Sequence, residues 1–200
     1  MNLGYFVSGI VSFSFIVGVT VSGLAGEPTE KIKETTGKIL SILSHPPLKD
    51  PSKTPERRKL IRKAVDERFD WEEMARRSLA IHWVRRTNEE KKEFTRFYSD
   101  LLERTYMSKV ESYSGEEVRY EGETKDGDYA TVKVKILTRK KTDIPVEYRL
   151  KEEGNDWMVY DISIEGVSLV NNYRTQFNSI IAQSSYENLV RRLKAKVSED

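Results

Sequence analysis

The amino-acid sequence predicts an α+β fold in which an antiparallel four-stranded sheet is covered on one face by helices. Two observations support this prediction. Apolar residues recur at helical spacing through the first half of the chain and near its end, whereas between Glu116 and Gly166 they alternate every second residue. Short turns separate the alternating segments, as antiparallel strands require. Because one face of such a sheet is apolar, helices must cover it.

Residues 1 to 25 differ in composition from the rest of the chain. They contain no charged side chain, an apolar run occupies 6–21, and small residues stand at positions 23 and 25. This pattern predicts a secretory signal peptide cleaved after Ala25. The alternative is an uncleaved anchor, since 3–25 could span a bilayer, and the protein would then be a membrane-anchored interaction module. Residues 26 to 200 are long enough for a single domain with its own core.

Capping residues predict where four helices begin: at Pro28, at Thr54 with Pro55, at Asp70 with Glu73, and at Thr87 with Glu90. The fourth helix is expected to run from Asn88 to about Ser112. One face of it carries an apolar stripe that needs a broad partner: Phe94, Phe97, Tyr98, Leu101, Leu102, Tyr106 and Val110.

Four strands are expected, the first beginning near Glu116 and the next three at 129–138, 144–152 and 157–164. Alternation places Ala130, Val132, Val134 and Ile136 on one face, and likewise Ile144, Val146, Tyr148 and Leu150. In the last strand it places Met158, Tyr160, Ile162 and Ile164 on one face and Trp157, Val159, Asp161 and Ser163 on the other. After Gly166 the period changes, so Ser168 is predicted to cap a helix that carries Val170, Tyr173 and Phe177 on its apolar face.

Composition excludes several classes of function. Lys+Arg 34 against Asp+Glu 32 gives a net charge of +2 with the signs interspersed, which argues against a nucleic-acid surface. The chain has no cysteine and two histidines, His45 and His82, so no metal site is expected. No glycine-rich phosphate loop or nucleophile elbow occurs, and no cofactor is expected.

Asp161 and Glu165 stand four residues apart and would share one face of a strand. Such a pair could do acid–base chemistry, and a small cone-shaped α+β hydrolase or isomerase is therefore one hypothesis. The structural interpretation is that Arg149 and Arg174 form ion pairs with these carboxylates. The orientation of the two carboxylates, toward the interior or toward arginine, would discriminate between the two.

Four segments resemble the MlaC family, periplasmic proteins that carry single phospholipid molecules between the two membranes of a Gram-negative envelope. They are FDWEEMARRSLAIHW (69–83), LLERTYMSKVESYSGE (101–116), PVEYRL (145–150) and WMVYDISIEGVSLVNNYRTQF (157–177). The resemblance implies a curved sheet with helices folded against it and a deep lipid cavity between the layers. It also implies a monomeric carrier without enzymatic activity that maintains outer-membrane lipid asymmetry. Its partners would be an outer-membrane lipoprotein–porin complex and an inner-membrane lipid ABC transporter with an MCE-domain subunit.

The large apolar residues of the two layers then have two interpretations. From the pattern alone the tyrosines are ordinary core residues. The resemblance implies instead that the space between the layers is partly open for acyl chains. The residues predicted to line it are Tyr98, Leu101, Leu102, Tyr106, Val132, Val134, Ile136, Val146, Tyr148, Leu150, Tyr160, Ile162, Ile164, Val170, Tyr173 and Phe177.

Overall fold

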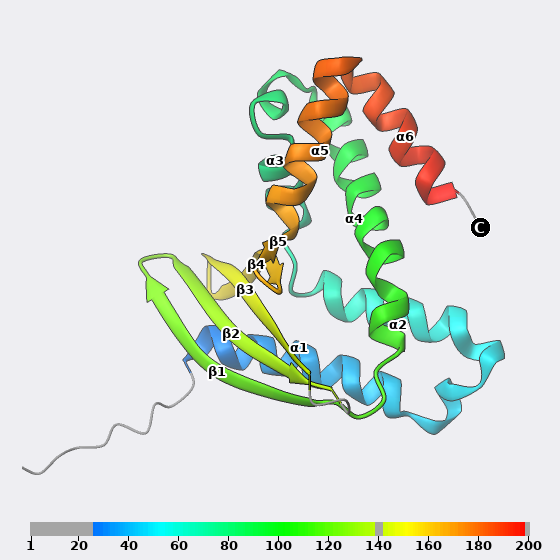
Figure 1. The fold of residues 1–200 in the computed structure, drawn as a ribbon, viewed down its shortest axis with the longest axis vertical. Helices are drawn as coiled ribbons and strands as arrows, with labels where there is room; N and C mark the ends of the chain where they lie inside the picture. Colours follow the sequence, from blue (N-terminus) through cyan, green and yellow to red (C-terminus); the bar gives the residue numbers. More distant parts are fainter. Residues whose placement is uncertain (1–25, 139–141, 199–200) are drawn as a thin grey trace, which may run out of the picture.

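A computed structural model describes residues 26–138 and 142–198 (Figure 1). The predicted signal peptide lies outside the described residues. The helices are α1 (Glu27–Ser44), α2 (Thr54–Asp66), α3 (Trp71–Leu79), α4 (Asn88–Glu111), α5 (Leu169–Gln183) and α6 (Tyr186–Ser198). Three short 3-10 helices join them: η1 (Pro46–Lys49), η2 (Pro51–Lys53) and η3 (Ala80–Arg85). The strands are β1 (Glu117–Asp126), β2 (Tyr129–Leu137), β3 (Asp143–Glu153), β4 (Asp156–Ile164) and β5 (Val167–Ser168).

The predicted helix starts are confirmed to within one residue, although Thr54 is itself the first residue of α2 and makes no capping bond. The caps of α3 and α4 depend on contacts within a few residues. Asp70 Oδ1 accepts a hydrogen bond from the backbone N–H of Glu73 at 2.9 Å. Thr87 and Glu90 form a complete capping box, with bonds of 3.2 and 2.8 Å. The cap of α1 is different, since Glu123 of β1 accepts from the backbone N–H and the hydroxyl of Thr29 at 2.9 and 2.6 Å. The first helix is therefore fastened to the sheet at its start.

The sheet is antiparallel in the order β1-β2-β3-β4-β5, which confirms the α+β class. It has five strands rather than the four predicted. The fifth forms because Glu165 and Gly166 adopt positive φ angles of 51° and 80°, so the chain turns back on β4 for two residues before α5 begins. The other half of the same edge is covered where Val159 exchanges backbone hydrogen bonds with Arg68 and Asp70 at 2.8 and 3.0 Å.

The predicted faces of β4 are wrong in its first half. The pairing of β3 with β4 shifts between Arg149 and Leu150, so Leu150 lies opposite Val159 while Tyr148 lies opposite Ile162. A β-bulge at Tyr160 causes the shift. Trp157 and Val159 therefore join the buried inner face. Tyr160 instead contacts the ring of Tyr129 at 5.9 Å, on the outer face.

Most buried apolar residues form two clusters, and Leu48, Ile61, Ala64 and Met107 are buried outside both. The helical cluster is built by α3, α4, α5 and α6, which form the bundle in the upper part of Figure 1. The sheet cluster joins the inner face of β2, β3 and β4 to Ile32 of α1. Phe69 and Ile162 contact both clusters. Among the described residues no helix has the length and apolar composition that a bilayer span requires.

Candidate functional site

A group of apolar side chains on α4 and the sheet is neither fully buried nor exposed, and one of them, Ile162, packs against both clusters. We call the group the interlayer set: Tyr106 of α4 with Val118, Tyr120, Ile136, Ile144, Tyr148, Ile162 and Ile164 of the sheet. The strand register places the sheet members on one face, since Val118 lies opposite Ile136 and Ile136 lies opposite Ile144. Tyr106 packs against the helical cluster, and most of the others pack against the sheet cluster.

The inner face of the sheet is thus closed at one end and less covered at the other. At the closed end Val132, Leu150 and Val159 are 0% exposed, and Ile32 of α1 packs with them. The interlayer set occupies the other end, where β1 and β3 begin and β2 and β4 finish. The fully buried residues of α1 all lie in its first half, between Pro28 and Thr35. Its second half presents apolar side chains that stay half-buried.

The residues predicted to line a cavity fall into four groups. Tyr98, Leu101, Leu102, Val170, Tyr173 and Phe177 are buried in the helical cluster. Val132, Val134, Val146 and Leu150 are buried in the sheet cluster. Tyr106, Ile136, Tyr148, Ile162 and Ile164 belong to the interlayer set. Tyr160 is the exception, because the bulge turns it to the outer face, where the guanidinium of Arg77 lies 4.1 Å from its ring centroid.

Tyr98 shows how tightly the helical cluster is packed. Its ring makes edge contacts with Tyr173 at 5.5 Å and with Phe177 at 5.7 Å. Its hydroxyl accepts a hydrogen bond from Ser78 Oγ at 2.9 Å, and burial raises its pKa. These are properties of a satisfied core tyrosine. Sequence periodicity could not separate it from the interlayer tyrosines, because both occupy the apolar face of an element.

Tyr106 and Tyr148 differ from Tyr98 in the hydrogen bonding of their hydroxyls, and the ammonium of Lys109 lies 5.7 Å from the ring centroid of Tyr106. Burial raises the pKa of Tyr148 to about 12, yet the side chain keeps part of its accessible surface. Burial also raises the pKa of Tyr106, with a smaller contribution from Tyr173. Among the described residues nothing donates to or accepts from either hydroxyl. Each hydroxyl is therefore available to a hydrogen-bond partner that the described residues do not supply.

Two open concavities on the protein surface lie away from the interlayer set. One, of about 370 Å³, lies between α4 and α6 and is lined by charged residues such as Glu90, Arg191 and Lys194. The other, of about 550 Å³, lies between α1 and α2 beside Gly37 and Leu60. Neither includes a residue that the sequence predicted for the site. Their mixed, solvent-facing linings suit no apolar ligand, so we do not assign the site to them.

The proposed acid–base pair of Asp161 and Glu165 does not form. Asp161 is 3% exposed and accepts three hydrogen bonds: from Ser168 Oγ at 2.6 Å, from the backbone N–H of Val170 at 3.1 Å and from Arg149 Nη1 at 3.1 Å. The prediction that Arg149 pairs with Asp161 is confirmed, as is the cap by Ser168. The prediction for Arg174 is wrong, because its Nε donates to the backbone carbonyl of Arg77 at 2.8 Å. Glu165 lies exposed in the turn before β5.

The two histidines lie in different surroundings. His45 is exposed between α1 and η1, and His82 Nε2 lies 3.0 Å from Asn178 Oδ1. Within 26–138 and 142–198, no three His, Cys, Asp or Glu side chains are grouped as metal ligands would be.

Three comparisons with known proteins agree with this architecture. A family model described as MlaC protein matches residues 33–195. The chain is 21% identical over 126 residues to the intermembrane phospholipid transport system binding protein MlaC of Haemophilus influenzae. That alignment spans 60% of this chain and 59% of the length of the curated relative. Among solved structures, a phospholipid-binding protein from Ralstonia solanacearum in complex with a phospholipid matches with a TM-score of 0.78 and 20% identity. The match covers 86% of this chain and 98% of that one, and it shows a shared fold.

Proposed function

The chain belongs to the MlaC family, and we propose that it is a periplasmic carrier whose ligand is a glycerophospholipid. In this proposal the acyl chains occupy the space bordered by the interlayer set, and the headgroup stays near the mouth of that space. In this proposal the signal peptide is cleaved after Ala25, and residues 26 to 200 act as a single phospholipid-binding domain. The relatives described above support the choice of ligand, since one is named for phospholipid transport and the other holds a phospholipid.

The observation that carries the proposal is the division of the apolar residues into two packed clusters with a half-buried group between them. A chain of this size normally completes one close-packed core. Here Tyr106, Ile136 and Tyr148 keep accessible surface although they lie on the inner sides of their elements. Tyr148 fits the same interpretation, because burial raises its pKa although part of its side chain remains accessible.

Transport of this kind needs binding and release rather than a reaction. Each buried CH₂ of an acyl chain is stabilised by about 0.8 kcal/mol, so an apolar space makes a lipid monomer tolerable away from a bilayer. The hydroxyls of Tyr106 and Tyr148 have no protein partner, and we propose that ester oxygens of the lipid accept their hydrogen bonds. The affinity must remain comparable to that of the membranes or proteins between which the carrier moves.

The partners are part of the proposal. We propose that the carrier exchanges lipid with an outer-membrane lipoprotein–porin complex and with an inner-membrane MCE-domain lipid ABC transporter, and so maintains outer-membrane lipid asymmetry. Reconstitution with each complex in separate vesicles tests this. Lipid transfer that is no faster with the complexes than with plain vesicles would reject these partners.

The ligand itself is tested by native mass spectrometry of the protein purified from a Gram-negative host. We expect bound glycerophospholipid at near one molecule per chain. The matched variants are Ile136→Trp, which fills the proposed space, and Ile81→Trp, which adds the same ring where the native residue is 72% exposed. Only the first should reduce lipid content. Protein that is lipid-free in every preparation and takes up no lipid from vesicles would refute the carrier function.

A further inference from the structure

Helix α2 is joined to α4 by charged side chains. Near the start of α2, Arg57 donates to Glu111 Oε1 through Nε and Nη2 at 3.1 and 2.8 Å, and Arg58 donates to Glu111 Oε2 through the same pair of atoms at 3.0 and 2.8 Å. Both arginines therefore donate hydrogen bonds to one carboxylate at the end of α4. The side chain of Glu111 is only 12% exposed.

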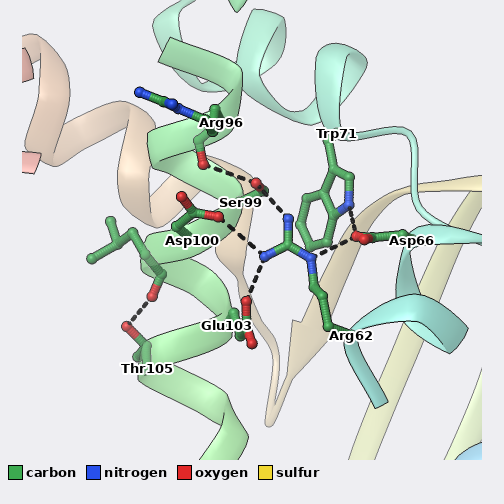
Figure 2. Close-up of polar contacts among 9 residues, drawn as sticks. Arg62, Asp66, Trp71, Arg96, Ser99, Asp100, Glu103 and Thr105 are labelled. Atoms are coloured by element: carbon green, nitrogen blue, oxygen red, sulfur yellow. Dashed lines mark hydrogen bonds and ion pairs between the residues drawn. The ribbon is translucent and has the colours of Figure 1, made fainter. Parts of the chain in front are cut away.

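A second contact lies one turn further along α2. Figure 2 shows the guanidinium of Arg62 beside the aromatic ring of Trp71, with dashed lines to Ser99, Asp100 and Glu103 of α4. Its Nη1 donates to Glu103 Oε2 at 2.6 Å and to Asp100 Oδ1 at 3.2 Å, and its Nη2 donates to Ser99 Oγ at 2.8 Å. We call the two contacts together the arginine seam: Arg57, Arg58 and Arg62 of α2 with Asp100, Glu103 and Glu111 of α4.

The apolar residues near this junction are few, and they include Met107, which is 7% exposed on the face of α4 that carries Glu103 and Glu111. The buried apolar side chains of α2 are Ile61 and Ala64, and neither belongs to the helical or the sheet cluster as the described residues form them. The elements that α2 packs on are α1, η1 and η2. The hairpin of α1 and α2 packs on the sheet through Ile32 of α1, and the arginine seam supplies hydrogen bonds between α2 and the long helix.

The hairpin is fastened firmly at its base. Where α1 begins, Thr29 is bonded to Glu123 of β1. Where α2 ends, Arg68 donates to Asp156 Oδ1 at 2.6 Å and to the backbone carbonyl of Trp157 at 2.7 Å, both in β4. The tip, by contrast, lies near the end of α4, where Arg57 donates to both Glu111 and the carbonyl of Leu48. The α1–α2 hairpin is therefore attached to the sheet where α1 begins and α2 ends. Its other end, at the connection between the two helices, is joined to α4 by ion pairs and can move away from it.

A polar seam also opens at lower cost than an apolar one. When an arginine and a carboxylate separate, water hydrogen bonds to both, whereas an apolar seam exposes surface that water solvates unfavourably. Behind this seam lie apolar groups. Tyr106 and Val110 of α4 are half-buried between Glu103 and Glu111 in the sequence, and Ile39, Leu40, Ile42 and Leu43 of α1 are half-buried on the hairpin. An opening here would lead from solvent toward the interlayer set.

We propose that the arginine seam is the latch of the port through which lipid passes, and that the α1–α2 hairpin moves away from α4 when the port opens. This proposal rests on the carrier function proposed above and adds the route. It assigns Glu111 a specific role, because one carboxylate holds two arginines of the hairpin.

The test locks the seam with a reversible cross-link. The natural chain has no cysteine, so the variant Arg58→Cys/Glu111→Cys carries one reactive pair, one thiol on each side of the seam. Lipid-loaded protein is treated with a homobifunctional methanethiosulfonate reagent, and transfer of the bound lipid to acceptor vesicles is followed before and after a reductant removes the link. The control is Glu93→Cys/Lys194→Cys, which replaces an ion pair of 2.8 Å between α4 and α6.

We expect the cross-link across the seam to slow transfer about tenfold or more, reductant to restore it, and the α4–α6 cross-link to change it little. Glu111→Gln, a second variant that keeps the side-chain volume, should transfer lipid severalfold faster than the natural protein at similar lipid content, and Glu93→Gln should not. If the cysteine variant fails to load lipid, the transfer rate of Glu111→Gln alone tests the proposed port. Unchanged transfer in both the locked protein and Glu111→Gln would overturn the port while leaving the carrier function in place. Absence of lipid from the natural protein would instead reject the carrier function.

Discussion

Replacing Asp161 by asparagine tests the junction at which the sheet passes into the helical bundle. Asp161 is 3% exposed and its two oxygens accept from Ser168 Oγ, Val170 N–H and Arg149 Nη1. The hydroxyl of Ser168 also caps α5, since it accepts from the N–H of Asn171 at 3.1 Å. The carboxylate therefore fixes the first turn of α5 against β4.

The magnitude follows from what an amide can still do at this position. Its oxygen can accept from Val170 N–H, but its NH₂ group cannot accept from Ser168 or Arg149. The bond from Ser168 is buried and charge-assisted, so its loss costs about 1.5–3 kcal/mol. The pair with Arg149 adds little, because the arginine side chain is 37% exposed and solvent screens it. We expect about 2 kcal/mol in total, or a melting temperature lower by about 4–8 °C for a chain of this length.

The assay is thermal and urea unfolding of the delipidated protein, with Glu165→Gln as the control. Glu165 is exposed in the turn before β5, so its amide variant should lie within about 0.5 kcal/mol of the natural protein. Lipid uptake by Asp161→Asn should persist below its melting temperature. An Asp161→Asn protein as stable as Glu165→Gln would show that the buried carboxylate is not structural, and a trapped unreacted ligand would revive the enzymatic hypothesis.

Three further predictions concern the interlayer set and the seam. Val132→Trp should lower the free energy of unfolding by about 1–3 kcal/mol, because Val132 is 0% exposed in a packed cluster. Ile136→Trp should instead leave the delipidated protein stable and reduce its uptake of lipid from labelled vesicles. Tyr148→Phe should change the stability of the lipid-free protein in urea unfolding by less than about 0.5 kcal/mol, since its hydroxyl has no protein partner to lose. It should weaken lipid binding, and unchanged binding would exclude a contact of the hydroxyl with the ligand. Burial acts to raise the pKa of Glu111, but hydrogen bonds from Arg58 and Arg57 outweigh it and hold the pKa below the ordinary 4.5. The contribution of Glu111 to stability is therefore present above pH 4.5 and lost as pH falls through the lowered pKa, so Glu111→Gln should melt below the natural protein at neutral pH and approach it in acid.

The parts of the fold that could be predicted from the sequence are those set by neighbours along the chain. Thr87 and Glu90 cap α4, and Ser168 caps α5, because each bond joins residues three apart. The turn at Asp126 and Gly127 and the alternation of β2 and β3 are equally local, and both were predicted correctly.

Features that depend on distant contacts could not be read from the pattern. Glu123 caps α1 across 94 residues, and the arginines of the seam reach carboxylates 38 to 54 residues away. The bulge at Tyr160 contains no glycine, the residue that often marks a bulge in a sequence. It accompanies the burial of Asp161 beneath the start of α5. Strict alternation along the sequence does not include this bulge. The prediction therefore assigned Tyr160 to the wrong face of β4 and left Trp157 out of the core.

The predicted lining set illustrates a more general limit. Periodicity tells which face of an element is apolar, but it does not tell how close the opposing layer comes. Tyr98 and Tyr106 lie on the same stripe of α4, yet one is 0% exposed among aromatic rings and the other keeps accessible surface. The difference arises because Tyr173 and Phe177 of α5 pack directly against the ring of Tyr98, and that is a property of the tertiary structure.

The proposed carrier function requires a protein that is stable with and without its ligand, and the division of the interior is compatible with this requirement. The helical cluster and the sheet cluster each contain fully buried residues, so neither needs a ligand to complete it. Two cores joined by few apolar contacts would leave the angle between bundle and sheet loosely defined. Asp161 supplies a directional connection at that point, because hydrogen bonds from Ser168 and Val170 hold α5 on β4 in one geometry. A hydrophobic residue there could pack equally well at several angles. The buried carboxylate therefore keeps the two layers in a defined relation, and we expect its removal to cost stability before it costs lipid binding.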